Sequence, residues 1–167
     1  MKLFLSRVAV LVSVLYTLNS CTADVSAPAT PTTVSQTTVP YPYTTFENET
    51  LTLINNYRLS IGLNALAKSD YISYKAEEHN NYMITNNVVN HNDFVARSED
   101  IMKTLGAKYV TENVAYNYNT PQAVLDAWLA SEGHKANLEG NYTHFGLSVR
   151  ENPTTGKKYY TNIFAKI

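Results

Sequence analysis

The chain has 167 residues, which is enough for one domain with a proper hydrophobic core. Its 13 basic and 14 acidic side chains nearly balance. The longest run of consecutive basic residues is the pair Lys157-Lys158. Binding to phosphates needs clustered Lys and Arg, so this composition excludes nucleic acid as an expected partner. A single cysteine, Cys21, excludes an intramolecular disulfide.

The first 20 residues have the pattern of an export signal. Lys2 and Arg7 are followed by a short apolar run at 8–18, which is too short to span a bilayer comfortably. The run ends in Leu18-Asn19-Ser20-Cys21, which resembles the lipobox of bacterial lipoproteins. We therefore expect residues 1–20 to be removed and Cys21 to carry lipids that anchor the protein to the cell envelope. The alternative is an ordinary signal peptide followed by an incidental cysteine.

Two segments of different composition follow the signal. Residues 21–45 are rich in Thr, Ser and Pro and hold almost no large aliphatic side chains. Such a segment cannot bury enough surface to offset its ordering entropy, so we predict a disordered tether. The folded domain is expected over residues 46–167.

Helices are predicted in the first half of this domain. Ser69 and Asp93 are suitable N-cap residues, and Gly62 and Gly106 are suitable helix ends. Between these signals the apolar residues recur at helical spacing. The expected helices cover residues 46–61, 69–85 and 94–105.

The second half mixes strands with one further helix. Residues 108–116 alternate as in a strand, and residues 145–149 and 158–165 are expected to form an antiparallel hairpin. Between them Thr120 caps a helix that should end at Gly133 in a left-handed conformation, leaving His134 at the helix exit. The predicted class is α+β.

Glu112 is the most informative single residue. It lies on the strand face that Val110 and Val114 share, which should be buried. A buried carboxylate is costly unless it is hydrogen-bonded, paired or bound to a cation. The alternatives are a register shifted by one residue, or a Glu112 that caps a neighbouring loop.

Two histidines are candidate partners for this carboxylate. His91 and His134, with Glu112, come from three separate elements and offer the donors that zinc or another divalent cation uses. The same groups suit general acid–base chemistry. His79 lies on the apolar stripe of a helix and is interpreted as a satisfied core histidine, and His144 has no assigned role.

Four ordered motifs carry a resemblance to a known family. They are NNYR at 55–58, NHNDF at 90–94, ENVA at 112–115 and WLASEGHKANL at 128–138. Together they resemble the CAP superfamily, which comprises cysteine-rich secretory, antigen 5 and pathogenesis-related proteins and is also called the SCP domain. The compact bacterial branch is the most similar.

The resemblance implies a three-layer α–β–α sandwich with a cavity lined by two His and two Glu, which binds zinc or another divalent cation in several members. His91, Glu112 and His134 fall on three of these positions. Ser131 stands where the second glutamate is expected, and Glu132 is its neighbour. The remaining candidates for lining the cavity are Ser131, Glu132 and Asn113.

These observations give one functional expectation and two alternatives. The expected protein is an envelope-anchored lipoprotein whose cleft binds an unknown lipid, small molecule or protein, with a divalent cation as the candidate bridge. No catalytic activity is assigned. The first alternative is a metal-assisted hydrolase, in which His91 and His134 hold zinc while Glu112 completes the shell or acts as base. The second is a structural or adhesive surface protein.

Overall fold

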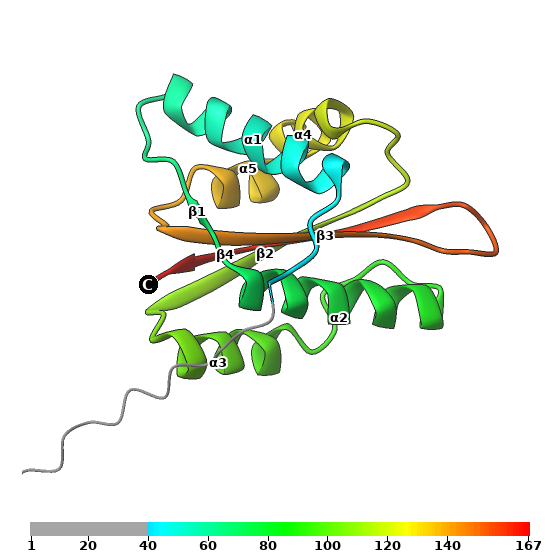
Figure 1. Cartoon of the computed structure of the whole chain (residues 1–167). Helices are drawn as coiled ribbons and strands as arrows, with labels where there is room; N and C mark the ends of the chain where they lie inside the picture. The colour runs from blue at the N-terminus through cyan, green and yellow to red at the C-terminus, as the bar shows by residue number, and fades with distance from the viewer. Residues whose placement is uncertain (1–39) are drawn as a thin grey trace, which may run out of the picture. The chain divides into compact units, whose positions relative to one another are not determined.

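The computed structural model describes residues 40–167 (Figure 1). The expected signal peptide, Cys21 and most of the expected tether lie outside these residues. Within 40–167, none of the helices has both the length and the apolar character needed to cross a bilayer.

A four-stranded sheet forms the centre of the domain, with strand order β1-β3-β4-β2. Strands β3 and β4 make the expected antiparallel hairpin, and β2 pairs antiparallel with β4. Strand β1 pairs parallel with β3 and was not predicted, because two residues show no periodicity. The strands are β1 Ala67–Lys68, β2 Tyr109–Tyr116, β3 His144–Glu151 and β4 Lys158–Lys166.

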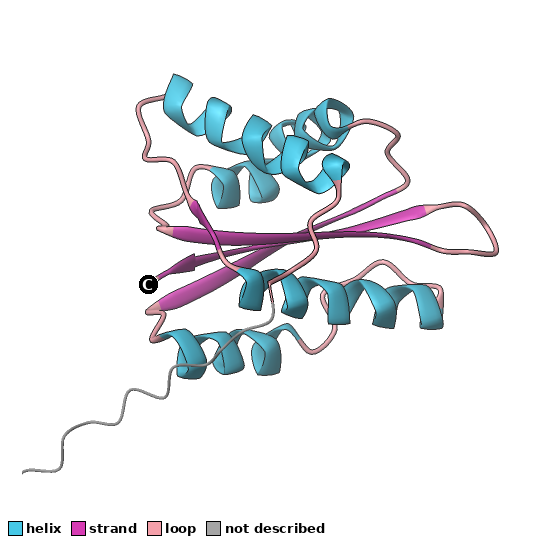
Figure 2. Ribbon diagram, in the orientation of Figure 1, coloured by secondary structure: helices cyan, strands magenta, loops and turns pink. Residues whose placement is uncertain are grey.

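Helices cover both faces of this sheet, as Figure 2 shows. Helices α1, α4 and α5 lie on one face, and α2 and α3 lie on the other. The predicted α+β class and α–β–α sandwich are therefore confirmed. The helices are α1 Thr45–Ser60, α2 Asp70–Asn86, α3 Phe94–Leu105, α4 Pro121–Ala130 and α5 Glu132–Leu138.

The alternation along β2 divides its side chains between the two cores. Val110 packs with α2 and α3 residues, and Val114 packs with Met83 of α2. Ala115, one residue further along, packs instead with the α1 and α4 cluster around Trp128. The predicted register is confirmed, so Glu112 faces the α2 and α3 layer.

The outer edge of β2 is closed by side chains from α4 and α5. Trp128 donates its indole N–H to the carbonyl of Val114 at 3.0 Å, and Asn137 donates to the carbonyl of Glu112 at 3.2 Å. An open strand edge is a site for unwanted pairing with other chains. These two donors satisfy the edge carbonyls without adding a strand.

This arrangement explains one error of the sequence prediction. The helix was expected to continue to Gly133, but α4 ends at Ala130, Ser131 is extended at φ −102° and ψ 119°, and α5 then begins at Glu132. A continuous helix would separate Trp128 and Asn137 by about 14 Å along its axis. Carbonyls two residues apart on a strand are only about 7 Å apart, so the break lets both side chains reach β2.

The edge of β3 beyond β1 is closed in a corresponding way. The backbone N–H of Leu147 donates to Ser73 Oγ at 3.2 Å, and the N–H of Val149 donates to Glu47 Oε1 at 2.7 Å. Glu47 is fully buried although it is charged.

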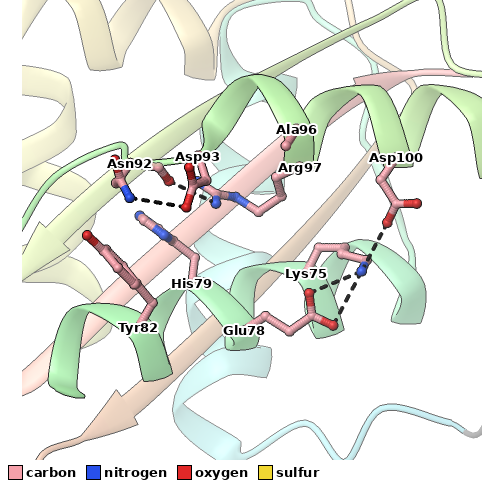
Figure 3. Close-up of a pocket in the computed structure, with 9 residues that line it drawn as sticks. All are labelled: Lys75, Glu78, His79, Tyr82, Asn92, Asp93, Ala96, Arg97 and Asp100. Atoms are coloured by element: carbon pink, nitrogen blue, oxygen red, sulfur yellow. Dashed lines mark hydrogen bonds and ion pairs between the residues drawn. The ribbon is translucent and has the colours of Figure 1, made fainter. Parts of the chain in front are cut away.

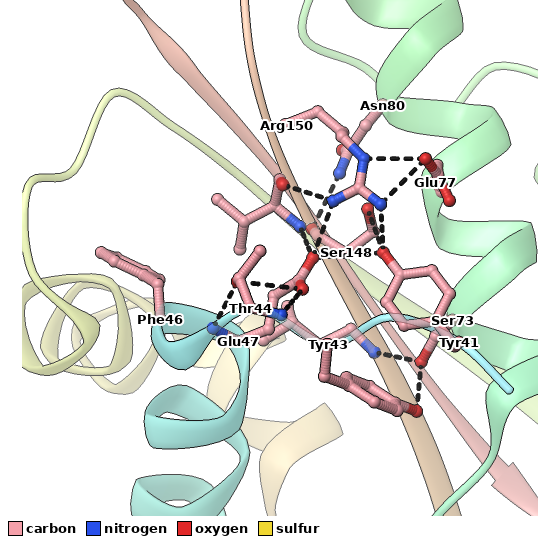
Figure 4. A network of polar contacts seen from close by, with 12 residues as sticks. Tyr41, Tyr43, Thr44, Phe46, Glu47, Ser73, Glu77, Asn80, Ser148 and Arg150 are labelled. Atoms are coloured by element: carbon pink, nitrogen blue, oxygen red, sulfur yellow. Dashed lines mark hydrogen bonds and ion pairs between the residues drawn. The ribbon is translucent and has the colours of Figure 1, made fainter.

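The Glu47 carboxylate belongs to a polar network that joins α1, α2 and β3 (Figure 4). Arg150 Nη1 lies 3.0 Å from Glu47 Oε1, and the same guanidinium contacts Glu77 at 2.8 Å. Thr44 donates its backbone N–H to Glu47 Oε2 at 2.8 Å, which completes a capping box at the start of α1. Both oxygens of this carboxylate are therefore satisfied.

The network also corrects the expected boundary of the tether. Residues 40–45 were assigned to it, but Tyr41 is only 4% exposed. Its hydroxyl donates to Ser148 Oγ at 3.0 Å and accepts from Arg150 Nη2 at 2.7 Å. The segment 40–45 is part of the fold, because its aromatic rings and hydroxyls supply partners for groups of β3 and α2.

We expect Glu47→Gln to lower the free energy of unfolding by about 3 kcal/mol, because it breaks a buried ion pair and turns an amide N–H₂ toward existing donors. Glu49→Gln is the matched control, since Glu49 is exposed on the same helix. Urea unfolding of the two variants measures the difference. Equal stability would show that the Glu47 carboxylate is not needed for the fold.

Candidate functional site

Glu112 is the centre of the candidate site, and its side chain is 1% exposed. Arg97 makes a bidentate contact with this carboxylate, with Nε 2.9 Å from Oε2 and Nη2 3.0 Å from Oε1. His91 Nδ1 lies 2.8 Å from Oε1. The buried carboxylate is thus paired, as the sequence suggested, and neither the shifted register nor the loop-capping alternative applies.

Arg97 was missed by the sequence analysis. It projects from α3, its side chain is 8% exposed, and its Nη1 also donates to the carbonyl of Asn92 at 3.2 Å. A signal for it exists in the sequence: Arg97 precedes the buried Ile101 by one helical turn. An arginine on the inward face of a helix indicates a buried acid nearby.

The loop before α3 places His91 on this ion pair. Asp93 is the N-cap residue of α3, as predicted, but it adopts a left-handed conformation at φ 57° and its side chain makes no capping hydrogen bond. Because of this turn, the carbonyl of His91 accepts the N–H of Phe94 at 3.1 Å. The ion-paired carboxylate only accepts, so Nδ1 of His91 donates, and in the neutral tautomer Nε2 is the acceptor. The ring is 47% exposed.

His79 lies on α2, next to Glu112, and is the satisfied core histidine that was predicted. It is 2% exposed, and its Nε2 donates to the carbonyl of Asn90 at 2.8 Å. The same nitrogen lies 3.8 Å from Glu112 Oε1. Burial lowers the pKa of His79 below its usual value and outweighs the opposing effects of Glu112 and the Asn90 carbonyl.

His134 approaches from the opposite layer, on α5. The side chain of Asn113 donates to the carbonyl of His134 at 3.0 Å and accepts from Asn137 at 2.8 Å, which fixes α5 to β2. Burial lowers the pKa of His134, and His91 is close enough for its charge to lower that pKa further. The two histidines therefore lie in opposite helical layers, within range of each other's charge.

The other residues suggested by the sequence have smaller roles. Asn113 is buried and positions α5, Ser131 is half-buried between α4 and α5, and Glu132 is exposed. His144 lies on β3, where its Nδ1 contacts Thr143 Oγ1 at 2.9 Å.

The arrangement of Glu112 decides whether the expected cation ligands fit. Both of its oxygens already bind Arg97, and one also binds His91. Within residues 40–167, no three or more His, Cys, Asp or Glu side chains are grouped as a metal ion would need. A cation about 4 Å from the guanidinium would be repelled by about 4 kcal/mol per unit charge. His91, Glu112 and His134 do not fit as a ready three-ligand set, and zinc binding stays a prediction.

A pocket of about 310 Å³ lies between α2 and α3, next to the ion pair (Figure 3). Arg97 and His79 form part of its wall. At its far end Lys75 is paired with Asp100 at 3.0 Å and with Glu78 at 3.1 Å. The charged groups of this pocket are thus largely paired with one another.

The lowered pKa of His79 predicts a pH dependence of stability. Below the ordinary histidine pKa of 6.5 the unfolded chain binds a proton that the folded state resists. The free energy of unfolding should therefore fall as the pH decreases below 6.5, by up to about 1.4 kcal/mol per pH unit for this group. Urea unfolding between pH 5.5 and 7.5 should show a smaller slope for His79→Gln. His144→Gln is the control, because it also removes one histidine. If the free energy of unfolding of His79→Gln depended on pH as strongly as that of the parent and of His144→Gln, the prediction would be contradicted.

Comparison with known proteins identifies relatives of this chain. The family model described as "Cysteine-rich secretory protein family", or CAP, matches residues 51–164. The uncharacterized protein YkwD and the uncharacterized membrane protein YlbC, both of Bacillus subtilis, are each 35% identical over 130 residues. These matches cover 75% and 74% of this chain but only 51% and 35% of the relatives, so the chain spans about half of their length or less.

Solved structures share the fold. An extracellular protein with an SCP domain from Bacillus anthracis aligns with a TM-score of 0.62 and 27% identity, over 72% of this chain and 40% of that one. An outer surface protein of Borrelia burgdorferi aligns with a TM-score of 0.64 and 22% identity, over 71% of this chain and 90% of that one.

Proposed function

Since the chain belongs to the cysteine-rich secretory protein (CAP) family, we propose that it is an exported, lipid-anchored binding module that presents the cleft of His91 and His134 to a ligand outside the cell. The observation that carries the proposal is the exposed His91 ring held on a buried ion pair.

The geometry favours binding over turnover. Glu112 fixes the His91 ring in one orientation, and Asn113 fixes the backbone of His134, so both imidazoles are presented on rigid supports. A neutral imidazole offers one hydrogen-bond donor and one acceptor. Such a pair suits recognition of a polar group on a ligand.

A hydrolase is the second candidate, and one contact favours it. The carboxylate–histidine pair of Glu112 and His91 orients Nε2 as an acceptor, as in sites where histidine acts as general base. If this were the function, the parent would turn over a substrate and Glu112→Gln would not; ligand binding by the parent without any turnover supports the module.

Export and anchoring rest on the sequence pattern that ends at Cys21 and on the relatives. The Bacillus anthracis neighbour is described as extracellular, and the Borrelia neighbour as an outer surface protein. The full chain expressed in a bacterial host should enter the detergent phase in Triton X-114 partitioning. Cys21→Ser should move it to the aqueous phase. Retention of Cys21→Ser in the detergent phase would contradict a lipid anchor at this residue.

The ring protons of the histidines provide a direct test of the cleft. We expect that a panel of acetate, inorganic phosphate, a disaccharide and phospholipid micelles, added to the full chain carrying Cys21→Ser, contains a probe that shifts the NMR signals of His91 and His134 together. The signal of His144 is the internal control, because His144 lies on β3 against Thr143. Saturating shifts at His144 alone, or at none of the histidines, would contradict the proposed site.

A further inference from the structure

The role of Arg97 goes beyond holding a buried acid. Its guanidinium contacts both oxygens of Glu112, the shortest distance being 2.7 Å, and both side chains are nearly inaccessible to solvent. Arginine stays charged under all ordinary conditions, and its planar group matches a carboxylate better than lysine does. Glu112 therefore has a permanent, geometrically matched cation as its partner.

This partner competes with any metal for the same oxygens. A divalent cation that bound Glu112 would have to displace Arg97 or lie beside it. Displacement would leave a nearly buried guanidinium without its counter-charge, which is strongly unfavourable. Binding beside it would place like charges together in a poorly solvated position.

We propose that Arg97 is the specificity-determining residue of this cleft: its guanidinium holds the position at Glu112 that a divalent cation would need, so the cleft recognises its ligand through the imidazoles without a metal bridge. The proposal rests on the proposed function in taking His91 and His134 as the binding surface. It adds that the cleft selects against divalent cations.

A variant that lacks the Arg97 charge is expected to behave differently toward zinc. Without the guanidinium, the Glu112 carboxylate is left as a buried charge without its counter-charge, with His91 Nδ1 2.8 Å and His79 Nε2 3.8 Å from its Oε1. These are donor types that zinc prefers. Removal of the Arg97 charge should create zinc affinity at the site.

Calorimetric titration of zinc chloride into the full chain carrying Cys21→Ser tests this. The parent should show no saturable site that depends on Glu112. Arg97→Met should show one site, at least about tenfold tighter than any binding by the parent. Adding Glu112→Gln or His91→Ala to Arg97→Met should abolish it.

Two single variants control for charge and for the position on the helix. Arg97→Lys keeps the positive charge and should exclude zinc as the parent does. Lys103→Met removes a charge from an exposed position of the same helix and should create no site. A site in Lys103→Met equal to that in Arg97→Met would overturn the role of Arg97.

Two results would overturn the proposal directly. One is a single zinc site in the parent that is lost in Glu112→Gln, and the other is Arg97→Met that folds with the parental circular dichroism spectrum but binds no zinc. If Arg97→Met does not fold, the parent decides: a zinc site that needs Glu112 overturns the proposal, and the lack of one supports it. The histidine NMR panel tests the proposed function separately, so a chain that excludes zinc but responds to no probe keeps this inference and loses that function.

Discussion

A thin sheet between two helical layers must satisfy the backbone groups along both of its edges, and much of this domain follows from that constraint. Trp128 and Asn137 close the β2 edge, while Ser73 and Glu47 close the β3 edge. Because each closing side chain comes from a helix, the same contacts fix the positions of the helices. The break between α4 and α5 is the clearest case, since it brings two donors from different helices onto neighbouring carbonyls.

The domain solves the problem of a buried carboxylate twice, with different outcomes. Glu47 accepts from backbone, hydroxyl and guanidinium groups and lies wholly inside the fold. Glu112 accepts from one guanidinium and one imidazole, and that imidazole reaches the surface. The first arrangement is structural. The second leaves a polar ring exposed on a rigid base, which is what distinguishes a candidate site from a core.

The sequence predicted those features that depend on local periodicity. The alternation of β2 placed Glu112 on the buried face, and the helical stripe of α2 placed His79 in the core. What it could not predict depends on distant contacts: the break at Ser131 serves two carbonyls of another strand, and Tyr41 is buried by groups of β3. Arg97 is an intermediate case. Helical spacing from Ile101 predicts that it faces inward, but the sequence does not identify Glu112 as its partner. The family resemblance supplied three site residues but not the arginine that changes their chemistry.

The burial of Tyr41 has a mechanical consequence. A pulling force applied at residue 40 would act on Tyr41, whose hydroxyl is hydrogen-bonded to Ser148 and Arg150 of β3. The load would pass into the central sheet through Arg150 and Glu47 before it could peel the first turn of α1. The candidate site lies at the far edge of the sheet, on β2, with β4 between it and the loaded strand. Tension on the N-terminal end would therefore be carried on the side of the sheet away from the exposed His91 ring.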